Sequence, residues 1–340
     1  MDKGNIRIIK AIVHILDSVS GFPVLSDVEL EVGPDFSEFL KEHIYKVATG
    51  DDSKNCTFLE GESEFFEIIK DVDENNFIEV SKQAAGMLFS IMNSNIDIPA
   101  ADLVVVVYSY EESFYLALLK MNYKNSYTHI TKPASDDGLS ANDIVMHKAI
   151  LPTKTQRVSE AALINLDDMS IRIVEKKYDV NGHKENYFSK MYIGCRTSLS
   201  QKSKLDIVTK AVERVVKDNY DESQQFEVDM RAKNIIHNEY INEGEIDVPV
   251  VVEKIFDTRP ELKEEFNEKV EKYNISKEPI RPENEKTVKK YDRQFLKTDT
   301  GIEIKIPMHE YENKDSVEFI TNPDGTVSVL IKNVEKIYSK

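Results

Sequence analysis

The chain has 340 residues, 41% of them hydrophobic, and carries 61 acidic against 44 basic side chains for a net charge of −17. This length suffices for about two domains with a sizeable apolar core. The acidic excess disfavours general adhesion to nucleic acid or anionic membranes, so any such contact must come from a local patch. No secretion signal or long apolar run is visible, which predicts a cytoplasmic protein without a membrane contact.

The N-terminal hundred residues alternate between strand-like and helix-like patterns. Period-two alternation predicts strands, and apolar residues at helical spacing predict amphipathic helices. Two strands are predicted first, at Ile6–Leu16 and Val24–Val32. Three helices follow, from Asp35 to Gly50, from Ser63 to Ile69 and from Asn75 to Met92.

Residues 102–123 contain two continuous apolar runs that flank Tyr110-Glu111-Glu112-Ser113. This pattern predicts a hairpin whose strands are central in a sheet covered on both faces. Three more strands are predicted at 144–151, 160–165 and 169–174. Their close spacing favours antiparallel, meander-like pairing over β–α–β units.

Beyond Cys195 the sequence changes character. Helical spacing is seen at 199–219, 226–240 and 262–270. Strands follow at 302–306, 317–321 and 326–331, the last two around the turn Asn322-Pro323-Asp324-Gly325. We therefore predict an α+β protein with an N-terminal, mainly antiparallel sheet with helices (1–195), a helical middle (196–278) and a small β-rich C-terminal part (279–340).

Catalytic and metal-binding patterns are missing from the sequence. It has no phosphate-binding glycine loop, nucleophile elbow or zinc-protease helix. Asp71 and Asp73 resemble the start of a calcium loop, but Asn76 and Lys82 stand where glycine and glutamate are required. His14, in an apolar strand, is interpreted as a hydrogen-bonded core residue. We predict a non-enzymatic protein without a metal or cofactor, with Cys56 and Cys195 as reduced thiols.

Charge is distributed unevenly along the chain. Residues 1–100 hold 19 Asp and Glu against 8 Lys and Arg, a net −11. Two later stretches are basic, with net charges of +4 at 196–217 and +3 at 281–297. Their candidate DNA-binding residues are Arg196, Lys202, Lys204, Lys210, Arg214 and Lys217 in the first stretch, and Lys286, Lys289, Lys290, Arg293 and Lys297 in the second.

Each basic stretch has two interpretations. If 281–297 is helical, its five cations share a face that could contact phosphates, with Tyr291 or Phe295 beside it. The alternative is an ordinary solvated helix face. Before the first stretch, the backbone amides of 194–198 could meet an anion. An ordinary capped helix start is preferred there.

Several segments, taken in their order and spacing, resemble the bacterial nucleoid-associated protein family of the 37-kDa NdpA type. They are Ile12-Val13-His14-Ile15-Leu16-Asp17, Phe77-Ile78-Glu79-Val80-Ser81-Lys82, Asp102-Leu103-Val104-Val105-Val106, Tyr115-Leu116-Ala117-Leu118-Leu119-Lys120, Tyr192-Ile193-Gly194-Cys195, Phe319-Ile320 and Asp324-Gly325-Thr326. The resemblance covers nearly the whole chain and carries over no catalytic residues. It implies a nucleoid-located protein that associates with double-stranded DNA, directly or through partners.

Two functional hypotheses follow. The first is a DNA-binding protein of little sequence specificity that uses the basic stretches. The second is an acidic protein-interaction factor that a DNA-acting partner recruits to the nucleoid. A homodimer is an additional expectation, because DNA-associated proteins often use two-fold symmetry.

Overall fold

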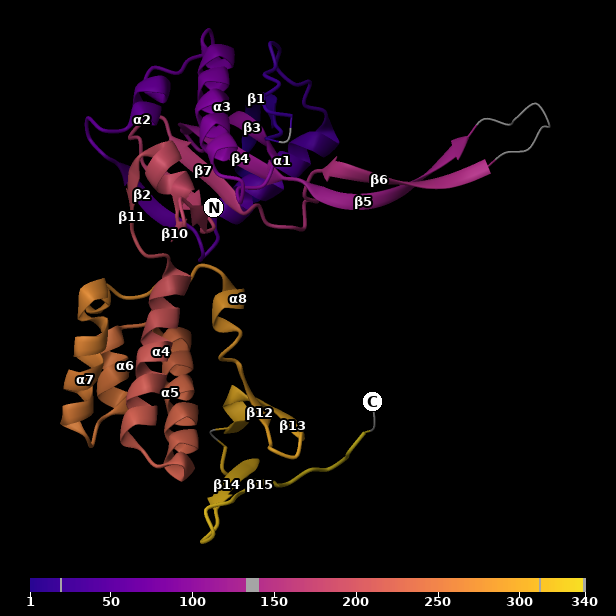
Figure 1. Cartoon of the computed structure of the whole chain (residues 1–340). Coiled ribbons are helices and arrows are strands. Elements are labelled where there is room, and N and C mark those ends of the chain that lie inside the picture. Colours follow the sequence, from indigo (N-terminus) through magenta and orange to yellow (C-terminus); the bar gives the residue numbers. More distant parts are fainter. Residues whose placement is uncertain (19, 133–140, 312, 339–340) are drawn as a thin grey trace. The chain divides into compact units, whose positions relative to one another are not determined.

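The computed structural model describes residues 1–18, 20–132, 141–311 and 313–338. The chain divides into two compact units, residues 1–199 and 200–340 (Figure 1). The predicted fold class is confirmed: an N-terminal antiparallel sheet with helices, a helical middle and a small β-rich C-terminal part. The boundaries at 195 and 278 stay predictions.

The first unit is built on a seven-stranded antiparallel sheet in the order β1-β3-β4-β7-β8-β2-β11. Its strands are β1 (Arg7–Leu16), β2 (Lys54–Phe58), β3 (Ala101–Tyr110), β4 (Ser113–Asn122), β7 (Glu160–Asn165), β8 (Ile171–Val174) and β11 (Cys195–Thr197). β3 and β4 form the predicted hairpin, and β4, β7 and β8 pair as the predicted meander.

Helices cover both faces of this sheet. The helix α1 (Pro34–Ala48) packs on one face, and α2 (Glu64–Ile69), α3 (Phe77–Ser94) and the π-helical turn η2 (Phe188–Ile193) pack on the other. Neighbouring residues of β3 serve the two cores in turn, since Val104 faces α1 and Val105 faces α3. Both are buried, which explains the continuous apolar runs and confirms that these strands are central.

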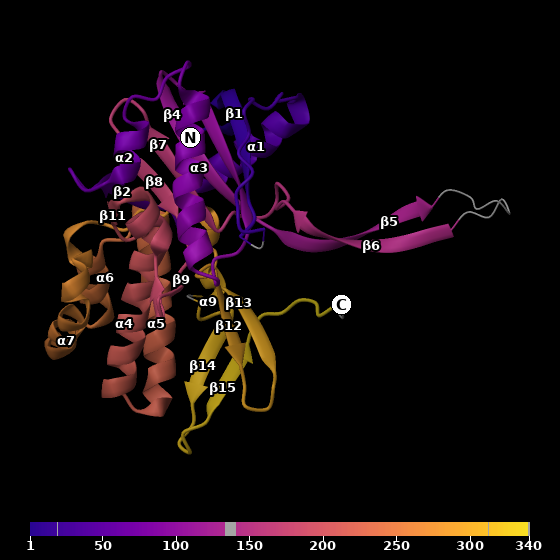
Figure 2. The same cartoon turned by 45° about the horizontal axis from the view of Figure 1, so that its top comes forward.

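A second sheet of the first unit projects away from this core. It consists of β5 (Lys124–Lys132) and β6 (Ala141–Ile150), which pair only with each other (Figures 1 and 2). We call this two-stranded ribbon the arm. A smaller hairpin, β9 (Tyr178–Val180) and β10 (His183–Glu185), lies just before η2.

The second unit has helices followed by two hairpins. Its helices are α4 (Gln201–Asn219), α5 (Glu222–Glu243), α6 (Val248–Ile255), α7 (Pro260–Val270), α8 (Glu285–Val288) and α9 (Met308–Tyr311), and its hairpins are β12 (Arg293–Lys297) with β13 (Glu303–Pro307) and β14 (Val317–Thr321) with β15 (Val327–Ile331). The ring centroids of Phe226 on α5 and Phe319 on β14 lie 5.4 Å apart, so β14 packs on α5.

The strand predicted at Val24–Val32 is wrong. This segment follows the outer edge of β1 but makes one isolated bridge, Ile15 to Val24, and one further hydrogen bond, from Leu30 N to Ala11 O. Its alternating residues do not bury one face, because Val28 is 72% exposed. The apolar and polar residues of this segment alternate, but it forms no continuous ladder of hydrogen bonds with β1 and is therefore irregular.

Helix α6 was missed because its sequence, Val248-Pro249-Val250-Val251-Val252, is rich in β-branched residues. Two local signals start a helix there. The Asp247 carboxylate accepts a hydrogen bond from the Val250 amide at 3.1 Å, and Pro249 lies in the first turn. The short strands β2, β5, β9, β10 and β11 were also not predicted.

Candidate nucleic-acid interface

Arg196 lies in the first unit and the other ten predicted cations lie in the second. It is the exposed middle residue of β11, the edge strand of the main sheet, and pairs with Thr57 of β2. A hollow of about 690 Å³ runs beside this edge, lined by Arg196, Thr57 and Ser198 and also by Glu60 and Glu62. The two carboxylates balance the guanidinium, so this edge is not a basic surface.

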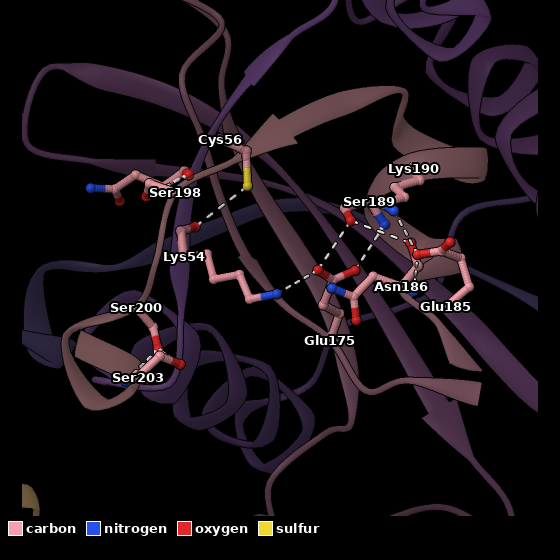
Figure 3. A network of polar contacts seen from close by, with 11 residues as sticks. Lys54, Cys56, Glu175, Glu185, Asn186, Ser189, Lys190, Ser198, Ser200 and Ser203 are labelled. Atoms are coloured by element: carbon pink, nitrogen blue, oxygen red, sulfur yellow. Dashed lines mark hydrogen bonds and ion pairs between the residues drawn. The ribbon is translucent and has the colours of Figure 1, made fainter. Parts of the chain in front are cut away.

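The cation next to this edge, Lys54, is engaged in an internal network (Figure 3). Its ammonium group lies 2.8 Å from the buried carboxylate of Glu175. That carboxylate also accepts hydrogen bonds from the amide and the hydroxyl of Ser189, both at 3.0 Å. The network therefore fixes η2 to the sheet and neutralises Lys54.

The backbone amides of Gly194 and Ser198 have structural partners, and that of Gly194 donates to the Ser189 carbonyl. Residues 195–197 form β11, and the Ser198 amide donates to the Asn55 carbonyl at 2.9 Å. Helix α4 begins only after Ser200, whose hydroxyl accepts a hydrogen bond from the Ser203 amide at 3.2 Å. The preferred interpretation, an ordinary capped helix start, is confirmed.

Four of the predicted cations share the solvent-facing side of α4. Its opposite side is buried, which directs the remaining positions outward. We call these exposed side chains the α4 basic surface: Lys202, Lys210, Arg214 and Lys217. Across the described residues, the three lysines of this set form no ion pair, and Arg214 lies 3.9 Å from Asp218. The row spans about 22 Å at 1.5 Å per residue.

Lys204 lies apart from this surface. It is half-buried on the flank of α4, and its ammonium group lies 3.5 Å from Glu278.

The second basic stretch reaches α4 at one point. The Lys290 ammonium group lies 2.8 Å from Asp206, which is one helical turn from both Lys202 and Lys210. The buried ring of Tyr291 fixes this approach, since its hydroxyl lies 2.7 Å from that of Thr209 on α4. Lys290 therefore joins the α4 basic surface and neutralises Asp206, whereas the exposed Glu213 remains on the same side of the helix.

Residues 281–297 do not form the single helix that would place their cations on one face. Only Glu285–Val288, which contains Lys286, is α-helical, and Lys289 and Lys290 follow in a turn. Arg293 and Lys297 lie on β12. Within β12 the buried Gln294 alternates with exposed neighbours, a period of two that specifies a strand.

Strand β12 instead presents its cations on one face of a hairpin. Arg293, Phe295 and Lys297 point the same way, and Lys305 of β13 stands opposite Phe295 with its ammonium group 5.5 Å from the ring centroid. Lys297 lies 3.5 Å from Glu303. We call this set the β12 face. Lys305 was missed from the sequence, although its alternation with Ile304 and Ile306 could have indicated it.

The residues weighed for metal binding and catalysis serve the fold. The described parts of the chain contain no group of three or more His, Cys, Asp or Glu side chains able to hold a metal ion. The Asp73 carboxylate accepts the amides of Asn75 and Asn76, at 2.8 and 3.0 Å, ahead of α3. Lys120 and Glu160, 3.7 Å apart on β4 and β7, are both fully buried. In the described segments, none of the helices has the length and apolar character needed to cross a bilayer.

Comparison with known families shows that this is a nucleoid-associated protein. The sequence model of the family described as nucleoid-associated protein YejK matches residues 12–338, nearly the whole chain. The chain belongs to that family, and the resemblance seen in the sequence is confirmed. A search of curated proteins found no match.

Proposed function

We propose that the chain is a cytoplasmic nucleoid protein that binds double-stranded DNA directly and with little sequence specificity. The observation that carries this proposal is the gathering of cations on α4, where Lys290 from the second basic stretch joins Lys202, Lys210, Arg214 and Lys217. Most of these side chains are free to meet phosphates, whereas other cations of this unit are paired with carboxylates, among them Arg231, Lys254, Lys263, Lys269 and Arg281.

The size of this surface sets the expected binding behaviour. Each phosphate contact releases condensed counterions and contributes about −0.9 to the slope of log affinity against log salt. Four contacts therefore give a slope of roughly −3 to −4 and a modest affinity at physiological salt. Contacts to phosphates alone carry no sequence information, so unrelated duplexes should bind equally. The β12 face, with Phe295 between its cations, is proposed as an extension of the same interface.

The experiment is a charge reversal on α4. The variant Lys210→Glu, Arg214→Glu, Lys217→Glu should bind duplex DNA at least about tenfold more weakly and reduce the salt slope by about three. A matched control reverses three exposed lysines elsewhere in the same unit, Lys272, Lys314 and Lys336, with the same change in net charge. Titrations of unrelated duplexes at several salt concentrations measure the affinity and the salt slope of each variant. Equal loss in the control, or no loss in the α4 variant, contradicts the proposed interface.

A second candidate function is recruitment by a partner. It is favoured by the net −11 of residues 1–100, which suits a basic, DNA-acting protein better than DNA. The α4 variant separates the two. If it loses duplex binding in solution but stays on the nucleoid in cells, a partner recruits the chain; if it leaves the nucleoid, direct binding does so.

We further propose that binding occurs without catalysis. The ion-paired Lys120 and Glu160 are both fully buried and so have no access to solvent or to a substrate. Duplex DNA incubated with the protein and Mg²⁺ or Mn²⁺ should stay intact, and nicking or degradation would overturn this point.

A further inference from the structure

The arm is a two-stranded sheet with both faces in solvent. Along its described length, residues 124–131 and 142–150, every residue is exposed except the half-buried Val145. A two-stranded ribbon is at best marginally stable in water without a covering surface. Its root is held firmly, because the Tyr123 hydroxyl donates to Asp102 at 2.5 Å and the Tyr123 amide donates to the Ala100 carbonyl at 3.1 Å. A fixed root and an uncovered ribbon are typical of a segment that another surface covers.

One face of the arm is apolar. Residues paired across an antiparallel ladder point to the same side. Tyr127 pairs with Met146, and the next pair on that side is His129 with Ile144. Tyr127, Ile144 and Met146 are 71%, 64% and 43% exposed. On the opposite side each pair holds at least one polar residue: Ser126 with His147, Thr128 with Val145, and Ile130 with Asp143. A continuous exposed apolar row on one face marks a contact surface.

A hollow of matching character lies at the far end of the main sheet. It measures about 300 Å³ and is lined by Ile9, Val107, Phe114 and Leu166. Phe114 is 50% exposed and Ile9 43%. The register of β1 against β3 shifts between Ile8 and Lys10, so Ile9 bulges out of the ladder beside the hollow. We call this site the Phe114 hollow.

The rim of the Phe114 hollow is acidic. Asp73, Glu74 and Asp167 surround it, and its one lysine, Lys10, is paired with Glu29 at 2.8 Å. By sequence, the two strands of the arm contain Lys124, Lys132 and Lys148 against a single aspartate, Asp143. The arm has an apolar row with lysines beside it, and the hollow has an apolar lining with carboxylates beside it. The two surfaces are therefore complementary in hydrophobicity and in charge.

The arm cannot fill the hollow of its own chain. Phe114 lies at the N-terminal end of β4, next to the turn from β3, whereas the arm begins beyond the C-terminal end of β4, after Asn122. Ten strand residues separate these ends by about 30 Å, and the arm extends away from the sheet in both views (Figures 1 and 2). Each chain therefore has a projecting apolar row and a hollow that only another molecule can fill.

We propose that two copies of this chain form a reciprocal dimer in which the arm of each protomer packs its Tyr127–Ile144–Met146 row into the Phe114 hollow of the other. The contact is self-complementary, since both protomers contribute the same two surfaces, as two-fold symmetry requires. The hollow accommodates one large side chain, and Tyr127 is the largest and most exposed of the row.

A duplex is the less suitable occupant of the arm, although a β-ribbon fits a major groove. The connecting segment 133–140 contributes Asp136 and Asp137, so the hairpin as a whole has three lysines and three aspartates. With no net charge over the whole hairpin, its few lysines can form local ion pairs with carboxylates but do not supply the row of phosphate contacts that binding a duplex requires.

The test measures the mass of the full chain by sedimentation velocity over a range of concentrations. The wild type should sediment with twice its chain mass of 39.0 kDa. The variant Tyr127→Glu, Ile144→Glu should weaken the dimer by about a hundredfold or more, because each change buries a charge in both contacts. The matched control, Ser126→Glu with His147→Glu, adds the same charge to the opposite face of the same hairpin and should remain dimeric.

A mixing experiment tests the reciprocity. The variant Phe114→Glu should also be monomeric, because it changes the hollow and leaves the arm intact. Mixed with the arm variant, it should restore part of the dimer, because one protomer then supplies an intact arm and the other an intact hollow. A monomeric wild type, a dimer that survives the arm changes, or no recovery on mixing would each overturn the proposal. A monomeric wild type whose arm variant loses duplex affinity would assign the arm to DNA instead.

Discussion

His14 is a buried side chain whose surroundings determine its protonation. Its Nδ1 atom accepts a hydrogen bond from the Ser26 amide at 3.1 Å, and its Nε2 atom lies 2.9 Å from the Ser81 hydroxyl, which donates to the Ile78 carbonyl. Nε2 therefore carries the proton of a neutral ring. Burial, and secondarily the charge of Lys82, lowers the pKa of His14 to about 4. The prediction of a hydrogen-bonded core histidine is confirmed.

This shift makes stability depend on pH. Below pH 6.5 His14 is protonated in the unfolded chain, whereas in the folded chain it stays neutral down to about pH 4. The free energy of unfolding therefore decreases as the pH falls from 6.5 to about 4. Between pH 7 and pH 5 the loss from this group is about 2 kcal/mol. His43 shifts in the same direction, so the comparison uses His14→Gln, which cannot titrate. Urea unfolding of both proteins at the two pH values should show the smaller pH effect in the variant; parallel curves would contradict it.

At the scale of elements, short segments take their conformation from their partners. β12 is a strand because Arg293–Lys297 pairs with Glu303–Pro307, although the spacing of its cations also suits a helix. In the first unit, β11 is only three residues long and depends on the turn that enters it. Gly194 ends η2 in the left-handed region, with φ of 65°, and its Cα faces Ser63 at close range.

Gly194→Ala should therefore destabilise the first unit by about 2 kcal/mol, which combines left-handed strain with a clash. An added Cβ would lie 3.0 Å from the Ser63 side chain and 3.1 Å from its Cα. Gly182→Ala is the matched control, since its φ is 80° but nothing lies within 4 Å of the added atom. It should cost about 1 kcal/mol, from strain alone. Chemical denaturation compares the two, and equal losses would show that the close approach does not matter.

At the scale of the whole molecule, the surfaces proposed for self-association and for DNA contact lie in different units. The first unit contains the strongly acidic residues 1–100, the arm and the Phe114 hollow. The second contains the α4 basic surface and the β12 face. The proposed functions divide in the same way, with self-association in the first unit and DNA contact in the second. A chain with a net charge of −17 can then bind DNA because the cations of α4 are gathered on one exposed surface.

Separate fragments test this division. Residues 1–199 and 200–340 each contain their own buried core, so both should fold when expressed alone, with cooperative unfolding as the check. Fragment 200–340 should retain duplex binding with the salt slope of a single intact chain, and fragment 1–199 should bind no duplex but still self-associate. Duplex binding that follows fragment 1–199 would contradict the assignment of the interface.

The sequence by itself determined the family, the α+β class and the long elements, because long periodic segments such as Arg7–Leu16 and Gln201–Asn219 bury one side regardless of detail. It also located the basic stretches. Tertiary structure alone decided that 285–297 turns from helix to strand, that Lys290 meets Asp206, and that the arm stays uncovered. These features depend on pairing and packing between residues far apart in the chain, which local periodicity does not encode.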